Sequence, residues 1–178
     1  MQKIITIEPL SPDQFEMYRN LVFESVTVEP LAFDVTLNEC MGFSNDFWKS
    51  QLSDSPRTNK MLFAKSSDAV VGMIGVRFGF FEKTRHTATI VSLYVKPEER
   101  DSGIGTQLFE ASLSLIRDKP YIRKVSLTVI SSQIAAMKLY KKYGFEIIGI
   151  QKNELFYEEK YYTQFKMELH IPEHSTIN

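Results

Sequence analysis

The residues with the clearest chemical potential stand in one short glycine-containing segment, Arg100-Asp101-Ser102-Gly103-Ile104-Gly105-Thr106. It follows an apolar run at 90–95 that is typical of a strand, and the residues after it have helical spacing. The first N–H groups of a helix have no acceptor within the helix, and the helix dipole is positive at that end. A helix starting near Gly103 therefore suits an anion such as a pyrophosphate. The two glycines keep these donors accessible, and Arg100 can add a charge-assisted contact.

Two other phosphate-binding loops do not fit these residues. A dinucleotide fingerprint requires a third glycine where Leu108 stands, and a P-loop requires Gly-Lys-Ser/Thr, which the sequence lacks. The structural alternative is that Gly-x-Gly before a helix forms only a tight strand-to-helix turn.

A second segment, residues 129–145, has the order strand, polar turn, short helix, glycine, new strand. Ser131 or Ser132 can cap the start of the helix, and Gly144 can take the left-handed conformation that ends it. Tyr140 is open to two interpretations, an ordinary aromatic on a half-buried helix face or a phenol that donates a proton in catalysis. On this segment alone, the ordinary aromatic is the favoured interpretation.

The sequence contains Arg-x-x-Gly-x-Gly after a Tyr-Val strand and, further along, Ala-Ala-x-x-Leu-Tyr-x-x-x-Gly-Phe. Together these two motifs resemble the GCN5-related N-acetyltransferase (GNAT) family. The resemblance covers most of the chain. It implies an α/β (α+β) GNAT fold, in which a mixed, mostly antiparallel sheet of about seven strands has helices on both faces and splayed central parallel strands. It also implies acetyl-CoA as co-substrate. The implied cofactor-binding residues are Leu93, Tyr94, Val95, Arg100, Ser102, Gly103, Ile104, Gly105, Thr106 and Gln133, the last where the family often has Asn.

The implied reaction is direct attack of a primary amine on the acetyl group in a ternary complex, with Tyr140 as acid for the departing thiolate. Many members carry a Glu on the central strand as general base, but this strand offers Thr87, Thr89 and Ser92, so no base is identified. The N-terminal helical region resembles an acceptor-binding lid. Its candidate substrate-binding residues are Glu24, Glu29, Phe33 and Glu39, for which a solvated or packing role is the alternative.

The expected acceptor is a small-molecule amine, with an amine on a peptide or protein as a variant. Two other functions stay open on the same fold: a non-catalytic module that binds or senses acyl-CoA, and a transferase with a different acyl-CoA donor. The first is made possible by the missing strand Glu.

Composition fits one globular domain over 1–178, with a flexible tail at 171–178. A net charge of -1 without a basic stripe argues against nucleic acid as a partner.

The single cysteine, Cys40, fits a reducing compartment, and the scattered histidines indicate no metal site. Without a membrane span or signal peptide, the expected location is cytoplasmic. An edge strand near the C-terminus permits a homodimer, so the state is monomer or homodimer.

Hydrophobic patterning predicts the elements that must position these residues. In order they are a strand at 3–8, a helix opened by residues 11–13, a helical region at 37–52 with Phe43, Phe47 and Trp48 inward, a hairpin of 61–64 and 70–81, a central strand at 87–95, a helix from Gly103 to about Arg117, a strand at 125–130, the Tyr140 helix, and strands at 145–151 and 161–169.

Overall fold

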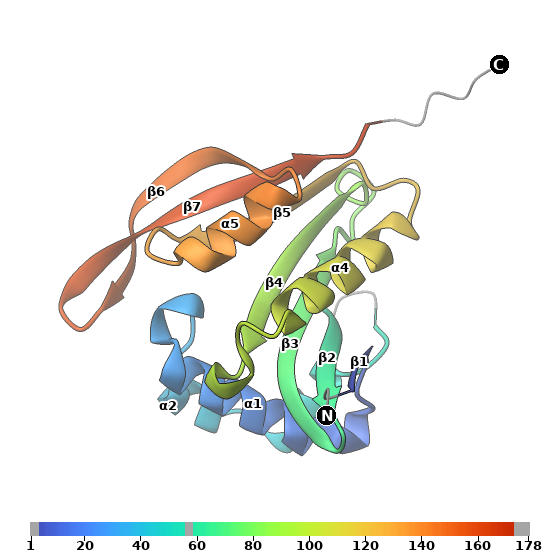
Figure 1. The fold of residues 1–178 in the computed structure, drawn as a ribbon, viewed down its shortest axis with the longest axis vertical. Coiled ribbons are helices and arrows are strands. Elements are labelled where there is room, and N and C mark those ends of the chain that lie inside the picture. The colour runs from blue at the N-terminus through green and yellow to red at the C-terminus, as the bar shows by residue number, and fades with distance from the viewer. Residues whose placement is uncertain (1–3, 56–58, 173–178) are drawn as a thin grey trace.

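The computed structural model describes residues 4–55 and 59–172, and Figure 1 shows their arrangement. The strands are β1 (Ile5–Glu8), β2 (Lys60–Ser66), β3 (Ala69–Phe78), β4 (Thr87–Val95), β5 (Lys124–Ile130), β6 (Glu146–Tyr157) and β7 (Lys160–His170). The helices are α1 (Phe15–Val28), α2 (Leu37–Met41), α3 (Asn45–Gln51), α4 (Ile104–Arg117) and α5 (Ile134–Lys142), with the 3-10 turns η1 (Pro12–Gln14), η2 (Pro30–Ala32) and η3 (Pro97–Glu99).

The strands form one seven-stranded sheet in the order β1-β2-β3-β4-β5-β7-β6. Neighbouring strands are antiparallel except for the central pair, β4 and β5, which is parallel. The predicted mixed, mostly antiparallel sheet is therefore confirmed.

The central parallel pair separates part of the way along its length. β4 and β5 are in register at Thr87 with Lys124, Ala88 with Val125 and Thr89 with Ser126. Both strands continue beyond these pairs, to Val95 and Ile130, without further pairing to each other. Beyond Thr89, the edge of β4 that faces β5 therefore has backbone groups that are not paired with β5, as expected for splayed central strands.

Helices cover both faces of the sheet, and neighbouring residues of β3 show which helix lies on which face. Met73 belongs to the core cluster that contains the α1 residues Leu21 and Val22. The next residue, Ile74, belongs to the cluster that contains the α4 residues Leu108 and Phe109. Because successive strand residues point to opposite faces, α1 and α4 pack on opposite faces. Figure 1 shows α4 in front of β3 and β4 and α5 close to β5 and β7.

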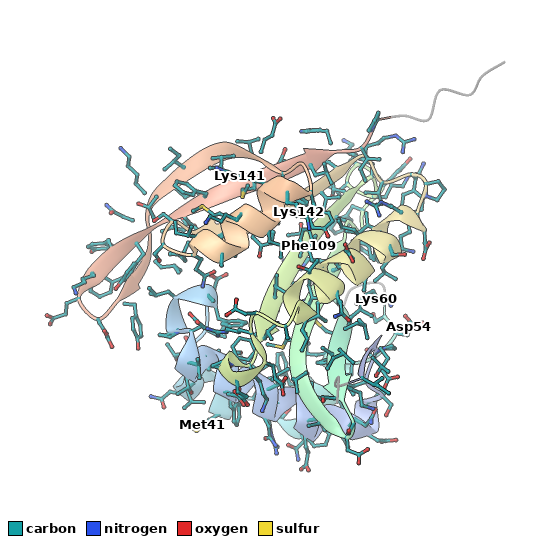
Figure 2. The ribbon with its side chains drawn as sticks, in the orientation of Figure 1. Met41, Asp54, Lys60, Phe109, Lys141 and Lys142 are labelled. Atoms are coloured by element: carbon teal, nitrogen blue, oxygen red, sulfur yellow. The ribbon has the colours of Figure 1, made fainter. Side chains whose placement is uncertain are left out.

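Phe109 connects the two helices of the α4 face. Figure 2 labels this side chain between α4 and α5, and its ring centre lies 5.3 Å from that of Tyr140 and 5.8 Å from that of Phe145. Phe109 is fully buried, and truncation of such a side chain to Ala typically costs about 3–5 kcal/mol. This packing fixes α5, and with it Tyr140, against the rest of the core.

The predicted helical region at 37–52 is in fact two helices. Gly42 ends α2, and Ser44 caps α3 by accepting a hydrogen bond from the Phe47 N–H at 3.2 Å. In a continuous helix this N–H would bond to a backbone carbonyl, but here the Ser44 side chain accepts it. The local capping signal therefore outweighs the apolar pattern that predicted one helical region. Trp48 points inward as predicted, at 2% exposure, but the inward prediction was wrong for Phe43 and Phe47, each 37% exposed.

The other differences concern the ends of elements. β6 continues to Tyr157 instead of ending at Gln151, because its register shift between Gln151 and Leu155 takes up a polar stretch that looks like a turn. Residue 171 does not fray, since the Ile171 N–H donates to the Arg123 carbonyl at 2.8 Å. Residues 173–178 of the predicted tail lie outside the described residues.

Candidate functional site

The loop between η3 and α4 presents a row of backbone donors. Asp101 and Gly103 have left-handed φ values of 59° and 84°, and α4 begins immediately afterwards. The N–H groups of Ile104, Gly105 and Thr106 have no hydrogen-bond acceptor within the described ranges, whereas the Gln107 N–H is already paired with the Gly103 carbonyl at 3.0 Å. Consecutive donors of this kind form an anion-binding site.

Glycine is required at one of the two positions for its conformation. At Gly103 the positive φ disfavours any side chain, although a Cβ built there meets no atom within 4 Å and so points into open space. At Gly105 a Cβ would meet only the Val95 Cγ2 atom at 3.8 Å, which is an ordinary contact. Gly105 is therefore not required by the packing of the protein itself.

Arg100 stands beside this loop but is already engaged. Its Nη1 atom lies 2.9 Å from the Glu29 Oε1 atom, and its Nε donates to the Val95 carbonyl at 3.1 Å. Arg100 therefore connects the loop to the end of α1 and to the end of β4. An anion bound at the loop would compete with Glu29 for the guanidinium.

A cavity of about 670 Å³ extends from the loop to the start of α5. It is lined by three groups of residues: Glu29 and Ala32 from the N-terminal region, Leu93, Tyr94 and Val95 from β4 with the loop residues that follow, and Ser132, Gln133, Ile134, Ala135, Ala136 and Leu139 around α5. Anion donors at one end and a mixed strand-and-helix wall along its length suit a phosphorylated ligand with an extended arm. Acetyl-CoA is such a ligand, so the residues present fit it.

A bulge in β4 shapes the wall of this cavity. Met73 pairs with Tyr94 and Gly75 with Val91, so β4 has one residue more than β3 over this stretch. The bulge contains Ser92, whose φ of 56° is left-handed and unfavourable for a residue with a side chain. Bulges redirect the backbone next to binding sites, and this one lies where β4 separates from β5.

Tyr140 lines a second, smaller cavity of about 280 Å³. Leu93 and Gln133 line both cavities, so the two adjoin. Tyr140 is 6% exposed, and burial raises the pKa of its phenol to about 12. Its hydroxyl has no hydrogen-bond partner among residues 4–55 and 59–172. At neutral pH this phenol is protonated and its proton is available to a group in the cavity.

The segment around α5 confirms one predicted signal and corrects another. Gly144 has a φ of 86° and follows the helix, as predicted. Neither Ser131 nor Ser132 caps α5, because the N-cap position is Gln133 and no side chain caps it. Ser132 and Gln133 line the larger cavity instead.

The four predicted acceptor residues separate into two pairs. Glu29 lines the larger cavity and Phe33 the smaller one. Both carboxylate oxygens of Glu24 are engaged, one accepting from the Tyr94 hydroxyl at 3.0 Å and the other 2.8 Å from Lys96 Nζ.

Glu39 forms a capping box with Thr36 at the start of α2, and the backbone hydrogen bond from Thr36 lowers the pKa of the Glu39 carboxyl. Neither Glu24 nor Glu39 is among the residues that line the two cavities. The acceptor role predicted for these two residues remains a prediction without support from their positions.

Sequence reasoning missed five polar residues on the smaller cavity: Asp34, Asn59, Arg77, Thr128 and Gln164. One signal for Arg77 was present, since it is the single charged residue in the otherwise apolar β3 segment Val70 to Phe78. Asp34 and Gln164 belong to no recognisable motif, and only the fold brings them to the cavity.

The described residues show neither a metal-binding cluster nor a membrane-spanning helix. Within residues 4–55 and 59–172, no group of three or more His, Cys, Asp or Glu side chains is placed to hold a metal ion. No helix in the same ranges has the length and apolar character needed to cross a membrane.

Comparison with known proteins relates this geometry to a family. Residues 25–145 match the model of the acetyltransferase (GNAT) family. A relative from Bacillus subtilis, described as a "putative" ribosomal-protein-alanine N-acetyltransferase, is 29% identical over 62% of this chain and 69% of its own length. The L-amino acid N-acetyltransferase AaaT of Escherichia coli is 25% identical over 70% of this chain and 75% of its own length.

A solved structure shares the fold. A Salmonella typhimurium protein described as a "putative" acetyltransferase, solved with its cofactor acetyl-CoA, superposes with a TM-score of 0.79 over 98% of both chains at 17% identity. The match of the family model over 25–145, together with the sheet order and the loop before α4, leads to one conclusion. The chain belongs to the acetyltransferase (GNAT) family.

Proposed function

We propose that this protein transfers the acetyl group of acetyl-CoA to the primary amine of a small molecule while both substrates are bound. The observation that carries the proposal is the juxtaposition of two adjoining cavities. One has the donors of Ile104, Gly105 and Thr106 at its end, and the other has the protonated Tyr140 in its wall.

Acetyl-CoA would be held by the larger cavity. The N–H groups from Ser102 to Thr106 would bind the pyrophosphate, with Arg100 alongside once Glu29 releases it. The backbone of Leu93, Tyr94 and Val95 would contact the pantetheine arm, and Gln133 stands where the two cavities meet. When bound, acetyl-CoA supplies the acetyl group as an activated thioester.

Tyr140 would hold the proton that the departing thiolate needs. Its raised pKa keeps the phenol protonated across the physiological range, and its hydroxyl has no competing acceptor among the described residues. The loss of one acid of this kind typically lowers a rate by about 10²- to 10⁴-fold.

The acceptor amine must lose a proton before it attacks, because an ammonium has no lone pair and a lysine-like amine has a pKa of about 10.4. Asp34 is the only carboxylate among the described residues that line the smaller cavity. It is the residue that can accept this proton, directly or through water, in place of the strand Glu that the family often uses.

The alternatives make different predictions. An acyl-CoA-binding or sensing module would bind CoA without releasing thiol with any amine, and a transferase with another donor would favour a longer acyl-CoA. A peptide amine is the second candidate acceptor, supported by the name of the Bacillus subtilis relative.

A cytoplasmic location is proposed because the buried Cys40 is the only cysteine in the chain.

The first experiment compares the thermal midpoint of the protein alone with that in acetyl-CoA, desulfo-CoA, NAD or ATP. A ligand at about 100 times its dissociation constant adds about 2.7 kcal/mol, which raises the midpoint by about 5–10 °C. We expect a rise with both CoA compounds and none with NAD or ATP. Absence of a rise with CoA would refute the loop assignment.

The second experiment measures thiol release with a panel of amines. Tyr140→Phe should keep the affinity for CoA and lose turnover. The matched control is Tyr143→Phe, because Tyr143 follows the same helix and its exposed hydroxyl bonds to Glu110. Equal rates for the two variants would remove Tyr140 from catalysis.

A further inference from the structure

We infer that the acceptor carries a carboxylate close to its amine, and that Arg77 binds this carboxylate. The acceptor class is therefore a small amino acid. This inference rests on the proposed function, because it names the substrate of the same site.

Arg77 is an exposed residue that lines the smaller cavity. It lies on β3 directly opposite Thr89 of β4, and paired residues on neighbouring strands project from the same face of a sheet. Both residues line the cavity. The Arg77 Nε donates to the Asn59 Oδ1 atom at 3.1 Å, which orients the guanidinium and leaves its two terminal nitrogens for another partner.

That partner is not supplied by the protein. Arg77 forms no ion pair within residues 4–55 and 59–172, in contrast to Arg100, which pairs with Glu29. A guanidinium binds a carboxylate through two parallel N–H donors, so an arginine in a substrate cavity without an acidic partner suits a carboxylate ligand.

The cavity carries one charge of each sign. Among the described residues that line it, Asp34 and Arg77 are the charged ones, and Asn59, Thr89, Ser92, Thr128 and Gln164 are neutral polar groups. Asp34, like Arg77, has no ion-pair partner in the described part of the chain. An amino acid also carries one charge of each sign, an ammonium for Asp34 and a carboxylate for Arg77. A simple amine or a peptide N-terminus would leave Arg77 without a partner.

The size and walls of the cavity narrow the class further. At about 280 Å³ the cavity is near the lower limit of ligand pockets, which span about 300–1,000 Å³. Its apolar lining includes Ile90, Val91 and Leu127, so it suits an amino acid with an apolar side chain. A peptide would have to continue into a neighbouring cavity of about 360 Å³, which shares Leu31, Phe33, Asp34 and Val35 with it.

The test compares acceptors that differ only in the carboxylate. Thiol release from acetyl-CoA is measured with L-leucine, L-methionine and L-phenylalanine, with the amide of each, and with a dipeptide that begins with leucine. We expect kcat/KM to be about 10- to 100-fold higher for the best free acid than for its amide, the range for losing a hydrogen bond to a charged group.

Variants assign the effect to one residue. Arg77→Gln should lower kcat/KM for the free acid about 10- to 100-fold, leave the amide unchanged and keep the affinity for CoA. The matched control is Arg85→Gln, an exposed arginine in the β3–β4 connection that lines neither cavity, and it should change neither acceptor. Equal or better use of the amides or the dipeptide would overturn the inference, as would an equal loss for both acceptors in Arg77→Gln.

A separate measurement distinguishes this inference from the proposed function. If CoA binds but no acceptor releases thiol, the proposed acetyl transfer to these amines is refuted. Calorimetry then measures the binding of each free acid to the complex of the protein with desulfo-CoA, and this binding tests the carboxylate site. Binding that disappears in Arg77→Gln but persists in Arg85→Gln would support the site. Absence of binding by every free acid would refute it.

Discussion

Replacement of Glu29 by Gln should tighten the binding of CoA. In the structure, Glu29 forms an ion pair with Arg100 at 2.9 Å and lines the same cavity as the phosphate-binding loop. Its carboxylate competes with a bound phosphate for the guanidinium and also repels that phosphate. Gln has nearly the same shape without the charge, so Glu29→Gln removes both effects.

The size of the effect follows from the exposure of the pair. The side chains of Arg100 and Glu29 are 40% and 34% exposed, so water and salt screen their attraction. Exposed pairs are typically worth about 0.2–1 kcal/mol, which converts to about a 1.4- to 5-fold lower dissociation constant for CoA in Glu29→Gln. The free protein should lose at most the same energy, equivalent to about 2–4 °C in its thermal midpoint.

Calorimetry with CoA at low and high salt tests this expectation. The tightening should shrink at high salt and should be smaller when Arg100 is also replaced by Gln, because only the direct repulsion between Glu29 and the phosphate is then left to remove. Glu98→Gln is the control, since it removes an equal charge from η3 without lining the cavity. Weaker binding of CoA in Glu29→Gln would refute the reasoning and would mean that Glu29 orients Arg100 toward the phosphate.

Three further predictions concern backbone conformation and protonation. Gly103→Ala should lower the free energy of unfolding by about 1–2 kcal/mol, because a side chain at a φ of 84° is strained. The same variant should bind CoA more weakly in calorimetry. Gly105→Ala should keep the stability of the unaltered protein. Since the pKa of Tyr140 is raised to about 12, kcat/KM should rise with pH as the acceptor amine deprotonates, and a decline centred below about pH 10 that Tyr140→Phe abolishes would contradict the raised pKa of this phenol. Burial also raises the pKa of Tyr18 to about 12, above the value near 10 of an unfolded chain, so its contribution to stability is complete below about pH 10 and lost between about pH 10 and 12. Urea midpoints over this range should fall less steeply in Tyr18→Phe than in the unaltered protein.

The parts of the site that could be predicted are those with local signals. The turn before α4 depends on Gly103, whose left-handed conformation only a few residue types tolerate, and the end of α5 depends on Gly144 for the same reason. The bounds of β4, Thr87–Val95, were predicted correctly because its apolar run is long and ends at a proline turn.

The parts that could not be predicted depend on contacts between distant segments. The engagement of Arg100 by Glu29 joins residues on different elements, and no spacing in the sequence indicates it. The break between α2 and α3 was missed because Ser44 gives a capping signal that is weaker than the surrounding apolar pattern. Arg77 and Asp34 reach one cavity only because β3 and the loop after η2 converge there in three dimensions.

The early separation of β4 from β5 divides the sheet into two blocks that are joined at three residue pairs. Strands β1 to β4 form one block and β5 to β7 the other, and the packing of Phe109 against Tyr140 supplies a second connection. Partial opening along this seam disrupts few backbone hydrogen bonds, so those amides of β5 that face β4 should exchange their hydrogens through a local fluctuation well below the energy of global unfolding. A ligand arm lying in the gap would contact both blocks and suppress that fluctuation. Bound CoA should therefore slow hydrogen exchange in β5, a strand that does not contribute to the phosphate-binding loop.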